Sequence, residues 1–160
     1  MTPRRNPSAF DYLFGLELIG IKFGLDNIIA ILDAIGHPER SFRSLHVAGT
    51  NGKGSVTAMA DRALRAAGHK SARYTSPHLV RLNERFSVGG ESIEDPALEA
   101  AIDDVRTAIE DLRHAGRLSA PPTFFEVTTA VAFELFRRAG VDVADVSALP
   151  TAINDPAPQS

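Results

Sequence analysis

The chain has 160 residues, of which 44% are hydrophobic and 23% charged, values typical of a globular protein with room for one core. The formal net charge of −3 gives no electrostatic argument for nucleic-acid binding, and the lack of cysteine excludes a disulfide framework and a cysteine-ligated zinc site. No apolar run is long enough to span a membrane and the polar first eight residues lack the apolar segment of a secretory signal, so we expect a cytoplasmic location without membrane or nucleic-acid partners.

The N-terminal and C-terminal residues differ in composition from the segment between them. Residues 1–9 are rich in proline and arginine, and we expect them to be disordered. Apolar residues recur at three- and four-residue steps over 25–35, which predicts an amphipathic helix that ends at Gly36. We expect the folded domain to span 10–146 and the proline-containing residues 147–160 to form a divergent, disordered tail.

A glycine-rich loop lies between an expected strand and an expected helix. The short apolar run 45–48 indicates a buried strand, and apolar residues at three- and four-residue steps over 56–67 predict a helix. This order of strand, loop and helix is the context of a phosphate-binding loop. The loop itself consists of Gly49, Thr50, Asn51, Gly52, Lys53, Gly54 and Ser55.

The residue types in this loop suit a polyphosphate. Glycines allow backbone N–H groups to turn towards an anion, and the helix N-terminus adds its partial positive charge. Lys53 can reach the β- and γ-phosphates, and Ser55 can offer its hydroxyl to Mg²⁺. The spacing differs from the common G-x-x-x-x-G-K-[ST] pattern, so the alternative is a glycine-rich turn with a surface lysine.

A second expected strand, 70–74, leads into a turn at Pro77, because proline cannot continue a central strand. In a parallel sheet a turn at the carboxyl end of a strand lies at the edge where ligands bind. Ser76 and His78 are therefore placed to face a nucleotide, although an ordinary turn serine and an exposed histidine are the alternative.

The residue pattern in the middle of the chain predicts a β-hairpin followed by a long helix. Residues 85–93 alternate around Gly89-Gly90, which is typical of a β-hairpin. Asp95 is the expected N-cap and Pro96 the first residue of the next helix, whose acidic residues look like a solvated surface.

The segment 123–130 opens a mostly apolar helix that ends near Arg138. Glu126 lies in its first turn among aromatic and aliphatic neighbours, where a carboxylate needs a cation or hydrogen-bond donors. Mg²⁺ is such a partner, since it is held by one or two carboxylates together with substrate phosphates. The alternative is that Glu126 only stabilises the helix N-terminus.

Three motifs together resemble one family. They are H-V-A-G-T-N-G-K-G-S-V, T-S-P-H-L followed by N-E-R-F, and F-F-E-V-T-T-A. They are similar to those of folylpolyglutamate synthase/dihydrofolate synthase, in the Mur ligase superfamily, and the resemblance covers about residues 10–144. It implies an α/β fold: a partial Mur-ligase-type P-loop nucleotide-binding domain with a largely parallel sheet flanked by helices.

The resemblance also implies roles for particular residues, with ATP and Mg²⁺ as cofactors. The triphosphate would lie on Gly49 to Ser55, with Lys53 catalytic, and Ser76 and Glu126 would be Mg²⁺ ligands. The T-S-P-H-L loop would lie near the folate, which assigns His78 to substrate binding. The pteroate pocket would be formed by residues just before the first amphipathic helix, here Lys22, Phe23 and Gly24.

The implied reaction joins L-glutamate to dihydropteroate or a folate through an acyl phosphate made with ATP. Beyond Ala144 the family would continue V-L-E-V-G-x-G-G-R, whereas here the charge of Asp145 and Pro150 argue against a buried parallel strand. We therefore expect a truncated ligase, with a catalytically inactive nucleotide-binding remnant as the alternative. A small P-loop kinase fits less well, because the second and third motifs have no role in it.

Overall fold

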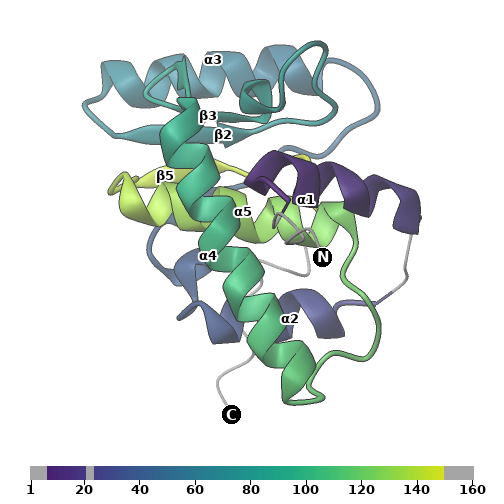
Figure 1. Ribbon diagram of the computed structural model, residues 1–160. Helices are drawn as coiled ribbons and strands as arrows, with labels where there is room; N and C mark the ends of the chain where they lie inside the picture. The colour runs from purple at the N-terminus through teal and green to yellow at the C-terminus, as the bar shows by residue number, and fades with distance from the viewer. Residues whose placement is uncertain (1–6, 21–23, 150–160) are drawn as a thin grey trace.

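The computed structural model describes residues 7–20 and 24–149 (Figure 1). Lys22, Phe23, residues 1–6 of the expected disordered N-terminus and residues 150–160 of the expected tail lie outside this description. No helix in the described ranges is long and apolar enough to cross a membrane.

The described strands form a five-stranded mixed sheet in the order β1-β5-β2-β3-β4. Its parallel part consists of β1 (Arg43–Leu45), β5 (Val143–Asp145) and β2 (Ser71–Tyr74), with β5 in the middle. The antiparallel part consists of β3 (Phe86–Val88) and β4 (Glu91–Ser92), joined by the expected two-glycine turn. The α/β prediction is confirmed, but among the described strands only β1, β5 and β2 are parallel. Strand β3 pairs antiparallel with β2, and its two-residue connection to β4 allows only antiparallel pairing there.

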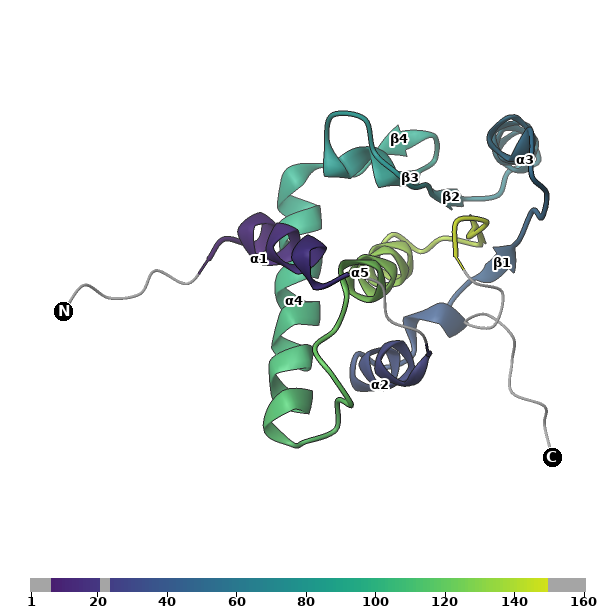
Figure 2. The same ribbon diagram turned by 90° about the vertical axis from the view of Figure 1, so that its right-hand side faces the viewer.

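Helices cover both faces of this sheet. Figure 2 shows α3 on one side of the strands and α1, α2, α4 and α5 on the opposite side. The α-helices are α1 (Ala9–Gly15), α2 (Asp26–Ala34), α3 (Lys53–Ala66), α4 (Asp95–His114) and α5 (Phe124–Arg138). Within the described residues, short 3₁₀ helices follow α1, α2 and β2: η1 (Leu16–Ile19), η2 (Pro38–Arg40) and η3 (Leu82–Arg85).

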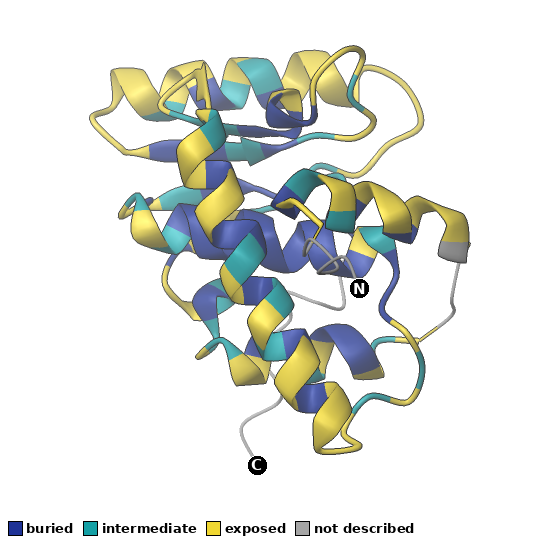
Figure 3. Ribbon diagram, viewed as in Figure 1, coloured by how far each residue is buried: buried dark blue, intermediate teal, exposed yellow. Residues whose placement is uncertain are grey.

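The core is built around α5, which is buried along most of its length (Figure 3). Phe42, just before β1, packs its ring 5.6 Å from Phe133 and 5.8 Å from Phe136 of α5. The apolar face of α4 closes the other side, since its recurring leucine, isoleucine and valine side chains are fully buried. The predicted periodicity of α4 is thus confirmed as a buried face. In α2 the expected Ile28 and Leu32 are buried, but Ile29, expected on the same face, is 57% exposed.

The start of α4 differs by one residue from the prediction. Glu94 is the N-cap and Asp95 the first helical residue. The Asp95 carboxylate does not cap the helix because it accepts hydrogen bonds from Arg81 at 2.7 and 2.9 Å and from Asn83 at 2.8 Å.

Two predictions about the parallel strands are wrong. Residues 45–48 are not a buried strand: β1 ends at Leu45 and is an exposed edge, because within the described chain it pairs only with β5. Asp145 does not prevent a strand either, since it ends the central strand β5 while its side chain is only 5% exposed. The ordered fold then continues through Ser147 to the buried Leu149.

The carboxylate of Asp145 is accommodated because donors surround it. The backbone N–H of Ser147 donates to Asp145 Oδ1 at 2.9 Å, and the Ser147 hydroxyl bonds the same oxygen. Arg73 on the neighbouring β2 places its Nε 3.9 Å from Asp145 Oδ2. A buried charge with a cation and donors around it is compatible with a central strand.

The attachment of α3 to the sheet is polar. Its buried residues are Thr57 and Asp61, whereas the apolar Val56 and Met59 are 44% and 64% exposed. Asp61 accepts a 2.5 Å hydrogen bond from the Ser71 hydroxyl of β2. Helix α3 is therefore held by hydrogen bonds on one side and leaves Val56 and Met59 exposed.

Candidate functional site

The glycine loop occupies the turn between β1 and α3, as the sequence predicts. Gly49 has φ +149° and Gly52, the N-cap of α3, has φ +76°. L side chains rarely adopt these conformations, so glycine is required at both positions. Because Gly52 has no side chain, no N-cap oxygen takes the first-turn N–H groups of α3, and residues 49–56 are exposed.

Lys53 is the first residue of α3, and its stem passes close to the loop. A Cβ added to Gly49 would lie 3.9 Å from Lys53 Cγ. Among the described residues, Lys53 takes part in no ion pair. The loop thus combines an unpaired ammonium, exposed glycine backbone and a helix N-terminus, which is the composition of an anion site.

The loop is anchored at both of its ends. The strand before it is held by the Val146 N–H, which donates to the Leu45 carbonyl at 2.9 Å. The helix after it is held by Arg73, whose Nη2 donates to the Thr57 hydroxyl at 3.0 Å. The first contact is with the residue after β5 and the second is with a residue of β2. The sheet therefore holds both ends of the loop.

Ser76 and His78 lie in the turn after β2 and share one partner, Arg85. The Arg85 Nη1 donates to Ser76 Oγ at 3.0 Å, and its Nε donates to His78 Nδ1 at 2.8 Å. Its guanidinium also lies over the ring of Phe124, 5.1 Å from the ring centre. The sequence does not distinguish Arg85, because the alternating pattern around this residue indicates only a hairpin strand.

Glu126 is buried at the start of α5 and forms a capping box with Thr123. Glu126 Oε2 accepts from the Thr123 N–H at 2.8 Å and from its hydroxyl at 3.1 Å, while Thr123 Oγ1 accepts from the Glu126 N–H at 3.2 Å. Glu126 thus stabilises the helix N-terminus, which is the structural alternative to metal binding that the sequence indicates. It uses one carboxylate oxygen, Oε2, for the cap.

The hydroxyl oxygen of Ser76 and the carboxylate oxygens of Glu126 are of the types that bind Mg²⁺. Within the described ranges there is no group of three or more acidic or histidine side chains that could hold a metal by themselves. Mg²⁺ commonly takes one or two carboxylates and completes its shell with phosphates and water, so a hydroxyl and one carboxylate are sufficient. Arg85 connects their two elements, since it bonds Ser76 and lies over Phe124, two residues before Glu126.

Of the residues expected to bind the acid substrate, two are described. Gly24 has φ +121° and open space around the position of a Cβ. His78 is half-buried and packs its ring 6.5 Å from Phe14 of α1.

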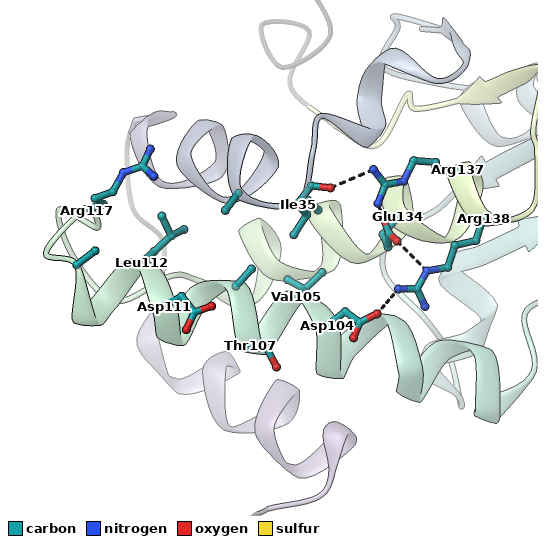
Figure 4. A pocket seen from close by; sticks show the side chains of 13 residues that line it. Ile35, Asp104, Val105, Thr107, Asp111, Leu112, Arg117, Glu134, Arg137 and Arg138 are labelled. Carbon is teal, nitrogen blue, oxygen red and sulfur yellow. Dashed lines mark hydrogen bonds and ion pairs between the residues drawn. The ribbon is translucent and has the colours of Figure 1, made fainter.

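Two cavities in the described part of the chain are lined by other residues. Figure 4 shows a cavity of about 590 Å³ between α2, α4 and α5, where Arg138 bonds Asp104 and Glu134, and Arg137 donates to the Ile35 carbonyl at 3.0 Å. A second cavity of about 480 Å³ lies beside the hairpin and the start of α4. None of the described residues expected at the site lines either of these two cavities.

Comparisons with known proteins agree with the motifs. No family model matches the sequence. The chain is 38% identical over 128 residues to the dihydrofolate synthase/folylpolyglutamate synthase of Bacillus subtilis, covering 80% of this chain and 29% of that protein. It is 41% identical over 117 residues to the folylpolyglutamate synthase of Lacticaseibacillus casei, covering 73% and 27%.

Solved structures show the same relationship. The folylpolyglutamate synthetase from Lactobacillus casei superposes with a TM-score of 0.79 at 36% identity, over 86% of this chain and 34% of that one. An FPGS–AMPPCP–folate complex superposes with a TM-score of 0.76 at 35% identity, over 86% and 33%. The chain spans about a third or less of the length of these relatives. By sequence and by fold, it belongs to the folylpolyglutamate/dihydrofolate synthase family of Mur-ligase-type proteins and matches their N-terminal part.

Proposed function

We propose that this chain binds ATP on residues 49–55 as part of a ligase that joins L-glutamate to dihydropteroate or a folate. The observation that carries the proposal is the start of α3, where the unpaired Lys53 follows the left-handed Gly52 on an exposed helix N-terminus. Such a terminus offers free N–H donors and partial positive charge to a polyphosphate. The relative solved with AMPPCP, a nucleotide analogue, supports the choice of ligand.

The proposed reaction has two steps. A carboxylate oxygen of the acid substrate attacks the γ-phosphorus of ATP, and ADP leaves. The amine of glutamate then attacks the carbonyl carbon of the acyl phosphate, loses a proton, and inorganic phosphate leaves. Phosphorylation is needed because a carboxylate oxygen is otherwise a poor leaving group.

Residues of this chain would stabilise the charge on the transferred phosphoryl group. Lys53 supplies an ammonium, and the backbone N–H groups of the loop and first turn supply donors that are already oriented. Mg²⁺, held by Ser76 and Glu126, would neutralise further phosphate charge. His78, with Phe23 and Gly24, would contact the acid substrate.

ATP binding to the parent protein and to Lys53→Ala, measured by calorimetry, tests the nucleotide site. We expect the dissociation constant to rise about 10- to 100-fold, the range for loss of a charge-assisted hydrogen bond. Lys70→Ala is the matched control, since Lys70 is an exposed lysine before β2 and should bind ATP as the parent does. Equal ATP affinity in the parent and in Lys53→Ala would remove the loop assignment.

ADP release tests the ligase. We expect release in the presence of ATP, Mg²⁺, glutamate and either dihydropteroate or folate, and none when the acid substrate or glutamate is omitted. ATP binding without any such turnover would instead select the second candidate, a nucleotide-binding remnant that has lost ligase activity.

A further inference from the structure

Arg85 is a buried cation whose donors are directed at the turn after β2. Arg85 is only 7% exposed and lies at the junction of η3 and β3. The Nε and Nη1 groups donate to His78 and Ser76, and the face of the guanidinium lies on Phe124. Within the described chain, Arg85 forms no ion pair with a carboxylate, so its contacts are these polar and aromatic groups.

These contacts determine which nitrogen of His78 carries the ring proton. A guanidinium only donates hydrogen bonds, so His78 Nδ1 must accept. An imidazole that accepts at Nδ1 is neutral and carries its proton on Nε2. Arg85 therefore makes His78 Nε2 a hydrogen-bond donor.

The orientation of the His78 ring is fixed as well as its proton. Arg85 holds the ring through Nδ1, while Phe14 packs against it with an interplanar angle of 58°. The ring is half-buried, and Leu79 and Val80, which follow it, are 92% and 84% exposed. The Nε2 donor thus belongs to a ring with two partners, beside two exposed apolar side chains.

We propose that Arg85 is a positioning residue that presents His78 Nε2–H to the acid substrate. This inference rests on the proposed function, since that function assigns His78 to substrate binding. The group recognised by Nε2–H would be an uncharged or anionic acceptor, such as a carbonyl or carboxylate oxygen. Lysine cannot replace Arg85, because one ammonium lacks the planar fork that spans both acceptors.

The tautomer of His78 distinguishes this role from a merely structural one. Protein labelled with nitrogen-15 in its histidine rings is measured by long-range proton–nitrogen correlation, and the His78 signals are assigned by their loss in His78→Gln. We expect a single Nε2–H tautomer in the parent. In Arg85→Met we expect signals of both tautomers, because methionine keeps the contact with Phe124 but donates no hydrogen bond.

Two further variants keep the test decisive. Arg85→Lys retains a positive charge at the site, and we expect it to show both His78 tautomers as well. If Arg85→Met is poorly folded, the His78 tautomer is measured in Arg85→Lys instead. Arg81→Met is the matched control, because Arg81 is an exposed arginine of the same loop that bonds Asp95 instead of His78. It should retain the parent tautomer.

Folate binding completes the test. We expect the folate dissociation constant to rise about tenfold in Arg85→Met and to be unchanged in Arg81→Met, as for loss of one or two hydrogen bonds to ligand. A single Nε2–H tautomer retained in both Arg85 variants, or an Nδ1–H tautomer in the parent, would overturn the role of Arg85. A parent that shows the expected tautomer but binds no folate would instead overturn the proposed substrate site.

Discussion

The backbone N–H of Val47 donates to the hydroxyl oxygen of Ser147 at 2.8 Å, across 100 residues of sequence. Val47 lies two residues before Gly49, and Ser147 lies two residues after the end of β5. The Ser147 backbone N–H in turn donates to Asp145. The chain that enters the glycine loop is therefore positioned by the carboxyl end of the central strand.

Removing the Ser147 hydroxyl should weaken both the fold and the nucleotide site. In Ser147→Ala, the Val47 N–H loses its acceptor, and we expect the free energy of unfolding to fall by about 1 kcal/mol. The ATP dissociation constant should rise about threefold, since the loop entrance is less well fixed. Urea denaturation and calorimetry measure the two effects.

The control for this variant is Ser92→Ala, because Ser92 is an exposed serine on β4, on the far edge of the sheet. It should change neither quantity. Identical ATP affinity in Ser147→Ala and the parent would show that the hydrogen bond to Val47 stabilises the fold without positioning the loop.

The Asp145 carboxylate should contribute more than the Ser147 hydroxyl, because it is paired with Arg73. In Asp145→Ala, Arg73 Nε, a buried atom without a hydrogen-bond partner, also loses its nearby negative charge. We expect a loss of about 2 kcal/mol in unfolding free energy, below the cost for a fully buried pair, since the Arg73 side chain is 22% exposed.

A double-mutant cycle with Arg73→Met separates the pair from its surroundings. We expect the double variant to be more stable than the sum of the single effects predicts, because it leaves no uncompensated charge. Additive losses measured by urea denaturation would mean that Arg73 and Asp145 do not interact across their 3.9 Å separation.

The sequence was sufficient for elements whose signals are local. The periodicity of α4 and the Thr123–Glu126 capping pattern lie within one helix each, and the two-glycine turn lies within one hairpin. The glycine loop was likewise readable, because strand, glycines, lysine and helix follow one another directly. These features depend on backbone preferences and on neighbours within a few residues.

The sequence was not sufficient to predict features that depend on an interaction partner far away in the sequence. Asp145 argued against a strand, yet Arg73, 72 residues earlier, lies beside it on β2 and offsets its charge. Arg85 looked like an ordinary strand residue, because its contacts with Ser76, His78 and Phe124 require the fold to bring three segments together. Burial of β1 was misjudged for the same reason, since only pairing shows that it is an edge.

The two roles of Glu126 can be separated by changing one partner at a time. Thr123→Ala removes the capping hydroxyl and should lower the unfolding free energy by about 1 kcal/mol. Since the Glu126 carboxylate is retained, the gain in ATP affinity on adding Mg²⁺ should be unchanged. Urea denaturation and calorimetry with and without Mg²⁺ measure these effects.

Glu126→Gln should give the opposite combination. Its amide oxygen can still accept from the Thr123 N–H, so the change in stability should be smaller than that of Thr123→Ala. The loss of the charge should remove most of the gain in ATP affinity on adding Mg²⁺. A Mg²⁺ effect that persists in Glu126→Gln would leave Glu126 with its capping role alone.

The Glu84 carboxylate gives the turn around His78 a dependence on pH. Three backbone N–H groups, those of Arg81, Leu79 and Val80, donate to it at 2.7, 2.9 and 2.9 Å. These hydrogen bonds favour the charged form and hold the pKa of Glu84 below its ordinary value of 4.5. The folded protein therefore binds this proton more weakly than the unfolded chain does.

It follows that the stabilisation by Glu84 is fully present above pH 4.5 and is lost as the pH falls through the lower pKa of the folded state. Unfolding free energies of the parent and of Glu84→Gln, measured from about pH 6 downwards, should converge on the acid side, because the parent alone loses this contribution. Glu91→Gln, at an exposed carboxylate of β4, should run parallel to the parent. A constant difference between parent and Glu84→Gln across that range would show that the three N–H groups do not favour the carboxylate, and the loop before Arg85 would owe its shape to other contacts.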